Sequence, residues 1–182
     1  MDAIPGYKAI ASLALVMVAL QVANTLTGYA LNTFGLVPRS LSGLPGLLLS
    51  PWLHGSWLHL LSNLLPFAVL SAIVMRDGMS RFIGVSAAVI LIGGLLVWSL
   101  GRSSIHVGAS GWVFGLWAYI LACAWFHRSF SNIAAALFVF AFYGGMVWGF
   151  IPRYGVSFES HVAGALAGIA VARLLVARRL PA

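Results

Sequence analysis

The chain has 182 residues, of which 62% are hydrophobic and only 7% are charged. Because a soluble domain of average composition has about 25% charged residues, this composition excludes an ordinary soluble protein and indicates an integral membrane protein. The net charge of +7 reflects a shortage of acids, three against ten Lys and Arg. The sequence has no dense basic patch of the kind that nucleic-acid binding needs.

A helix that crosses a membrane needs about 20 mostly apolar residues. Six segments meet this requirement, and we predict helices at about 9–30, 57–75, 82–100, 110–126, 132–150 and 160–177. The first resembles a signal peptide, with Lys8 ahead of an apolar run, but it is too long and lacks a clear cleavage signal. We therefore expect one domain over residues 1–182, an all-α membrane protein with six transmembrane helices.

The placement of Arg and Lys predicts how the helices are oriented. Six spans put both termini on one side of the membrane. Seven basic residues would lie on that side: Lys8, Arg76, Arg81, Arg128, Arg173, Arg178 and Arg179. Three would lie on the other: Arg39, Arg102 and Arg153. The positive-inside rule then favours cytoplasmic termini, with the apolar connection at 31–56 outside, at the membrane interface.

Reactive polar residues lie at the start of the three helices that run from outside to inside. The helix at 57–75 begins with His59 and, four residues on, Asn63, so their side chains share one face. Ser110 begins the helix at 110–126, and His161 begins the one at 160–177. Alone, each has a structural explanation, such as a helix cap or a contact between helices. Together they place four groups suited to acyl transfer at similar depth.

Small residues predict that two of these helices pack together. Two GxxxG pairs are present: Gly111 with Gly115, and Gly164 with Gly168. This spacing lets helix backbones approach closely in lipid. Such packing would bring Ser110 near His161, which could deprotonate the serine as it attacks a carbonyl and then protonate the leaving amine.

The scarcity of acids narrows the chemistry. The chain has three: Asp2, Asp77 and Glu159. This excludes an intramembrane aspartyl pair, and the absence of HExxH excludes a zinc protease of that kind. We expect Glu159 to point away from His161. The remaining enzyme hypothesis is a Ser-His dyad without metal or cofactor, with the oxyanion stabilised by His59, Asn63 and the backbone at Ser110.

Three motifs in this order resemble those of the rhomboid intramembrane serine proteases. "GASG" resembles the family's GxSG nucleophile motif and places the nucleophile at Ser110. "HGSWLHLLSN" resembles its oxyanion motif, which implies that role for His59 and Asn63. "SHVAGALAG" resembles the motif that carries the catalytic histidine, here His161, and the packing glycines. The resemblance covers nearly the whole chain and implies a six-helix rhomboid-like bundle.

Three further positions compare with the family pattern. His54 matches an additional histidine upstream of the oxyanion motif, and we expect it to be structural rather than catalytic. Phe114 stands where several members have a tyrosine that packs against the catalytic histidine, so the ring is kept and the hydroxyl is lost. Trp52 has no arginine beside it, unlike the Trp-Arg pair of many bacterial members.

The resemblance implies a serine endopeptidase that cleaves peptide bonds in or near transmembrane segments of membrane-protein substrates. It also implies a bacterial inner membrane with the site toward the outer face. The expected partners are those substrates and the lipid bilayer. Two alternatives are a catalytically silent rhomboid-like protein that binds membrane clients and a small transporter. Proteins of the first kind lack the nucleophile or the histidine, and this sequence has both. A transporter should show inverted repeats or broken helices, and this sequence shows neither.

Overall fold

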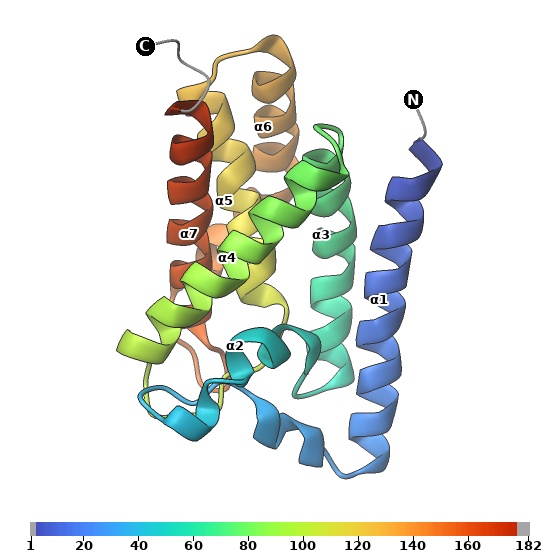
Figure 1. The fold of residues 1–182 in the computed structure, drawn as a ribbon, viewed down its shortest axis with the longest axis vertical. Coiled ribbons are helices and arrows are strands. Elements are labelled where there is room, and N and C mark those ends of the chain that lie inside the picture. Colours follow the sequence, from blue (N-terminus) through green and yellow to red (C-terminus); the bar gives the residue numbers. More distant parts are fainter. Residues whose placement is uncertain (1–2, 178–182) are drawn as a thin grey trace.

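The computed structural model describes residues 3–177, so Asp2, Arg178 and Arg179 lie outside the described part. Its α-helices are α1 (Ala3–Leu26), α2 (Gly46–Leu49), α3 (Trp57–Met75), α4 (Met79–Leu100), α5 (Ser110–Phe126), α6 (Phe130–Tyr143) and α7 (Phe158–Ala177). Four 3-10 helices lie between them: Ala30–Phe34, Leu41–Gly43, Ser50–Trp52 and Gly144–Phe150. The prediction of an all-α membrane protein is confirmed. In Figure 1, α1 begins and α7 ends at the same end of the bundle.

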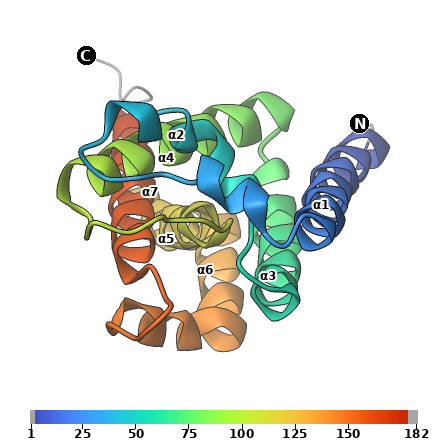
Figure 2. The same ribbon diagram turned by 90° about the horizontal axis from the view of Figure 1, so that it is seen from below.

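The count of six long spans needs correction. Within the described residues, five helical segments are long and apolar enough to cross a membrane: Gly6–Leu26, Trp57–Met75, Met79–Leu100, Phe130–Phe150 and Phe158–Leu175. The helix at Ser110–Phe126 has 17 residues and is shorter. In Figure 2, α5 lies in the middle of the bundle, with α3, α4, α6 and α7 around it. The sixth predicted segment is therefore a helix that the other spans enclose.

Two helix ends differ from the predicted ends for local reasons. The segment predicted at 9–30 ends at Leu26, because Gly28 and Tyr29 adopt left-handed φ angles of 62° and 67°. Left-handed residues just after the last turn are a common way to end a helix. The segment predicted at 132–150 changes from an α-helix to a 3-10 helix at Gly144.

The connection at 31–56, predicted to lie at the membrane interface, has an ordered structure. It folds into short helical turns, and Leu36, Gly43, Gly46 and Pro51 are buried. A Cβ atom at Gly43 would lie 2.7 Å from the Val37 carbonyl oxygen, so only glycine fits there. This compact segment packs against the end of the bundle where α3 and α5 begin, which is the end that holds the candidate site.

Candidate functional site

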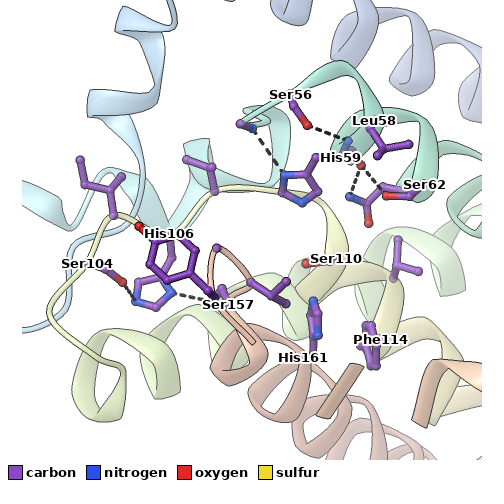
Figure 3. Close-up of a pocket in the computed structure, with 18 of the residues that line it drawn as sticks. Ser56, Leu58, His59, Ser62, Ser104, His106, Ser110, Phe114, Ser157 and His161 are labelled. Atoms are coloured by element: carbon purple, nitrogen blue, oxygen red, sulfur yellow. Dashed lines mark hydrogen bonds between the residues drawn. The ribbon is translucent and has the colours of Figure 1, made fainter. Parts of the chain in front are cut away.

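The four predicted chemical groups line a single cavity of about 880 Å³. His59 and Asn63 come from the first turns of α3, Ser110 from the start of α5, and His161 from the first turn of α7. Phe114 lines the same cavity, one turn below Ser110. In the view of Figure 3, Ser110 and His161 are drawn next to each other at the cavity.

Ser110 is the first residue of α5, so its backbone N–H has no acceptor within the helix. The two N–H groups before it are occupied: that of Gly108 donates to the Ser50 carbonyl (2.9 Å), and that of Ala109 donates to His54 Nε2 (3.3 Å). The Ser110 N–H is therefore the first free donor at this helix end. The positive end of the helix dipole favours a negative charge there.

Gly108 allows the turn before the nucleophile position. Its φ of +122° is one that side chains rarely permit, and a Cβ atom there would lie 2.6 Å from His59 Cε1 and Nε2. The imidazole of His59 therefore packs directly on the backbone that leads into Ser110. The glycine of "GASG" serves both the conformation of this turn and the close approach of His59.

His161 is buried, with 8% of its surface exposed, and its neighbours fix its orientation. Its Nδ1 lies 2.7 Å from the Gly149 carbonyl oxygen, which can only accept a hydrogen bond. Neutral His161 therefore carries its hydrogen on Nδ1 and has a free lone pair on Nε2. Its ring stacks on Phe114, with centroids 4.2 Å apart and planes 4° from parallel.

The glycines of α5 and α7 set how closely Ser110 and His161 approach. A Cβ atom at Gly164 would collide with the Gly111 carbonyl oxygen, and one at Gly168 would collide with that of Gly115. Among the described residues, no hydrogen bond joins Ser110 to His161. Such bonds are often long in enzymes without substrate and shorten in the reacting complex.

The oxyanion candidates on α3 also have defined hydrogen positions. The Gly55 N–H donates a long bond (3.4 Å) to His59 Nδ1, so neutral His59 carries its hydrogen on Nε2. Asn63 is 5% exposed, and its amide nitrogen donates to the His59 carbonyl oxygen (2.9 Å). That bond uses one of the two amide hydrogens of Asn63 and leaves the other for a ligand.

His54 has a structural position beneath the nucleophile turn. It is fully buried, and burial, together with the nearby His59, lowers its pKa to about 4. A neutral ring can accept from the Ala109 N–H, as observed. The Asn24 side chain donates to the His54 carbonyl oxygen (3.2 Å), which links α1 to this turn. No periodic pattern connects positions 24, 54 and 109, so sequence reasoning missed this support.

Glu159 forms an ion pair with Arg102 in the loop before α5, and no hydrogen bond joins it to His161 among the described residues. No group of three or more His, Cys, Asp or Glu side chains that could hold a metal ion occurs within residues 3–177. The structure therefore offers His161 the Gly149 carbonyl, and not a carboxylate, as the group that orients its ring.

Comparison with known proteins finds two kinds of similarity. A family model described as the Rhomboid domain matches residues 42–178. An uncharacterized protein of Mycobacterium tuberculosis is 34% identical over 182 residues, covering 94% of this chain and 76% of that protein. An uncharacterized protein of Mycobacterium leprae is 35% identical over 168 residues, covering 87% of this chain and 66% of that protein.

Proposed function

This chain belongs to the rhomboid family of membrane proteins, and we propose that it is an active intramembrane serine endopeptidase. The proposal rests on the arrangement of Ser110 and His161, which line the same cavity. The hydrogen bond between His161 Nδ1 and the Gly149 carbonyl leaves Nε2 of His161 free to accept a proton. The proposed substrates are membrane proteins, cleaved in or near a transmembrane segment.

In the proposed first step, Ser110 Oγ attacks the carbonyl carbon of the scissile bond. His161 Nε2 takes the hydroxyl proton as the new C–O bond forms. The Gly149 carbonyl holds the Nδ1 hydrogen and supports the resulting imidazolium, a role that a carboxylate has in a Ser-His-Asp triad. Phe114, stacked on the ring, restricts its rotation.

The oxyanion that forms in this step needs hydrogen-bond donors already in place. The proposed donors are the Ser110 N–H at the start of α5, the Nε2–H of His59 and the second amide hydrogen of Asn63. They come from α3 and from the start of α5, and the His59 ring packs on Gly108 just before α5, so the donor set is held without the substrate. Donors fixed before the reaction need no reorganisation when charge develops.

In the second half of the proposed reaction, the C–N bond breaks and His161 returns the proton to the leaving amine. Water then enters the cavity and attacks the ester carbon while His161 takes its proton; the C–O bond to Ser110 breaks, and His161 returns that proton to Ser110 Oγ. An intact helix hides its carbonyls in hydrogen bonds, so the substrate segment must unwind locally to present one.

The proposed setting is a bacterial inner membrane, with both termini in the cytoplasm and the cavity toward the outer face. The excess of Lys and Arg on the side of the termini supports this orientation. The helix starts that line the cavity lie at the opposite end of the bundle from the start of α1 and the end of α7. Water would therefore reach Ser110 from outside.

Labelling with a fluorophosphonate, which reacts with activated serines, tests the proposal. We expect the purified protein in detergent to be labelled on Ser110, and we expect no labelling of Ser110→Ala or His161→Ala. Both variants should remain folded, as judged by thermal unfolding. An unlabelled, well-folded wild-type protein would favour a catalytically silent client-binding protein or a transporter instead.

A further inference from the structure

Two side-chain bridges join the loop at 101–109 to the residues that begin α7, and the proposed chemistry uses neither. The loop leads directly into Ser110, and α7 begins at Phe158, just before His161. His106 forms one bridge and Arg102 forms the other. Figure 3 shows the first, with His106 pointing to Ser157 at the side of the cavity.

His106 is buried, with 3% of its surface exposed, and both of its ring nitrogens have partners. Nδ1 lies 2.5 Å from Ser157 Oγ, and Nε2 lies 3.0 Å from the Arg102 carbonyl oxygen. Because a carbonyl oxygen can only accept, neutral His106 carries its hydrogen on Nε2. Its Nδ1 must then accept from the Ser157 hydroxyl, so the backbone of the loop fixes the direction of the bridge.

Ser157 immediately precedes α7, where a serine side chain caps a helix. Its Oγ lies 3.4 Å from the Ser160 backbone nitrogen and 2.7 Å from Ser160 Oγ. Since Ser157 donates its hydroxyl hydrogen to His106, its oxygen accepts from both Ser160 groups. A chain of hydrogen bonds therefore runs from the residue beside His161, through Ser157, to His106.

The backbone of His106 is fixed from its other side. Leu36 and His106 exchange two backbone hydrogen bonds, of 3.0 and 2.8 Å, as an isolated antiparallel bridge. Leu36 is 2% exposed and belongs to the compact segment at 31–56. His106 thus ties three parts of the chain together: that segment, the loop before Ser110 and the start of α7.

Arg102 restrains the same junction from the solvent side. Its guanidinium pairs with Glu159, donates to the Val156 carbonyl (3.0 Å) and lies 5.1 Å from the centroid of the Phe158 ring. The Arg102 side chain is more than half exposed. Exposed ion pairs contribute little, so the buried bridge between His106 and Ser157 has the larger effect on this junction.

We propose that His106 and Ser157 are positioning residues whose hydrogen bond aligns Ser110 with His161. His106 lies four residues before Ser110, and Ser157 lies four residues before His161, so one bond fixes both segments just ahead of the dyad. The inference rests on the proposed function, because alignment of these two groups matters only if they react. A misplacement of about 1 Å can lower a rate on the order of 10²-fold.

The test uses the full-length protein in liposomes with a single-pass transmembrane model substrate. The variants are His106→Leu, Ser157→Ala and the two combined. The matched control is Ser99→Ala, because the Ser99 hydroxyl is exposed and bonds only the Leu95 carbonyl of its own helix. Measured are kcat, KM, the rate of fluorophosphonate labelling and the unfolding temperature.

We expect each single variant to lower kcat and the labelling rate by roughly 10- to 100-fold, with little change in KM. The double variant should be no slower than the slower single variant, because both remove the same bond. Ser99→Ala should match the wild type. His106→Asn should recover most of the lost rate, since its amide oxygen takes the place of Nδ1 as an acceptor for Ser157.

Besides unchanged activity of the folded variants, two results would overturn the inference. One is a raised KM with unchanged kcat in His106→Leu, which would mean that His106 contacts substrate. The other is a multiplied loss in the double variant, which would mean that the residues act separately. If His106→Leu does not fold, His106→Asn and Ser157→Ala decide by the same measurements. Full activity of folded His106→Leu contradicts this inference alone, whereas an inactive, unlabelled wild type removes the proposed function and the inference with it.

Discussion

Helices α5 and α6 are neighbours of similar apolar character, yet the bundle places them very differently. Ten of the 17 residues of α5 are buried, whereas only Ala135 and Val139 of the 14 residues of α6 are. Phe140 and Phe142 of α6 are 70% and 72% exposed. Lipid is as apolar as a protein core, so hydropathy does not separate these helices; close packing through small residues does.

The difference matters for the candidate site. α5 begins at Ser110 and contacts α3, α4, α6 and α7, so its first turn is held on several sides. α6 supplies none of the groups of the proposed dyad or oxyanion site. The proposed chemistry therefore depends on the enclosed helix and its neighbours, and changes on the outer face of α6 should have little effect.

The largest difference between the two regions should appear when an oxyanion donor beside α5 is removed. His59→Ala or Asn63→Ala should lower kcat by roughly 10²–10³-fold, because loss of one such donor typically has that effect. Cleavage of a model transmembrane substrate measures this, with Phe140→Ala on α6 as the control. Normal turnover in both α3 variants would mean that His59 and Asn63 only support the structure.

The second-largest effect should come from widening the contact between α5 and α7. Gly164→Val places methyl groups against the Gly111 carbonyl and should lower turnover on the order of 10²-fold by separating Ser110 from His161. Gly84→Val is the matched control, because nothing lies within 4 Å of a Cβ atom at Gly84 on α4. Unfolding temperatures of both variants separate misalignment from loss of fold. Near-normal turnover in Gly164→Val would contradict the role given to this contact.

The two helices should also differ in how much a truncated leucine destabilises the protein. Leu116 of α5 is fully buried, so Leu116→Ala should lower the free energy of unfolding by about 2–5 kcal/mol. Leu137 of α6 is 64% exposed, and Leu137→Ala should change it by less than about 0.5 kcal/mol. Denaturant titration in detergent measures both, and equal losses would refute the contrast between the helices.

The last expected effect concerns pH and the turn before α5. The pKa of His54 is about 4 in the folded protein, below its usual value of about 6.5. Between these values the unfolded chain binds a proton that the folded one does not. Stability is therefore complete above about pH 6.5 and decreases toward pH 4, by on the order of 3 kcal/mol.

His54→Gln is the matched variant for that measurement, because it keeps an acceptor for the Ala109 N–H but does not titrate. Its unfolding temperature should vary less between pH 6.5 and pH 4 than that of the wild type. An identical pH dependence in the two proteins would show that other groups cause the loss of stability.

Sequence reasoning predicted the parts of this fold that follow from local pattern. The helices at 57–75 and 110–126 have the predicted bounds, and the side chain of Ser56 caps the first of them by accepting from the His59 N–H. The pattern also placed Ser110 and His161 at helix starts on the same side, and the structure brings them to one cavity. Whether they react stays a prediction.

The parts that could not be predicted depend on contacts between distant loops. The bond between His106 and Ser157 spans 51 residues, and that between Ala109 and His54 spans 55. A single sequence holds no periodic signal for either pair. The enclosure of α5 by its neighbours was not predicted either, since apolar composition does not show which of the six predicted segments lies in the middle of the bundle.

The decisive test of the Ser-His dyad is cleavage of a single-pass model substrate in liposomes. Equal amounts of folded wild type, Ser110→Ala and His161→Ala are compared. The wild type should cleave within or beside the transmembrane segment, and its rate should fall as pH drops through the histidine range, because a protonated His161 cannot act as a base. Both variants should fall to the level of protein-free liposomes. Cleavage above that level by either variant would contradict a Ser-His dyad.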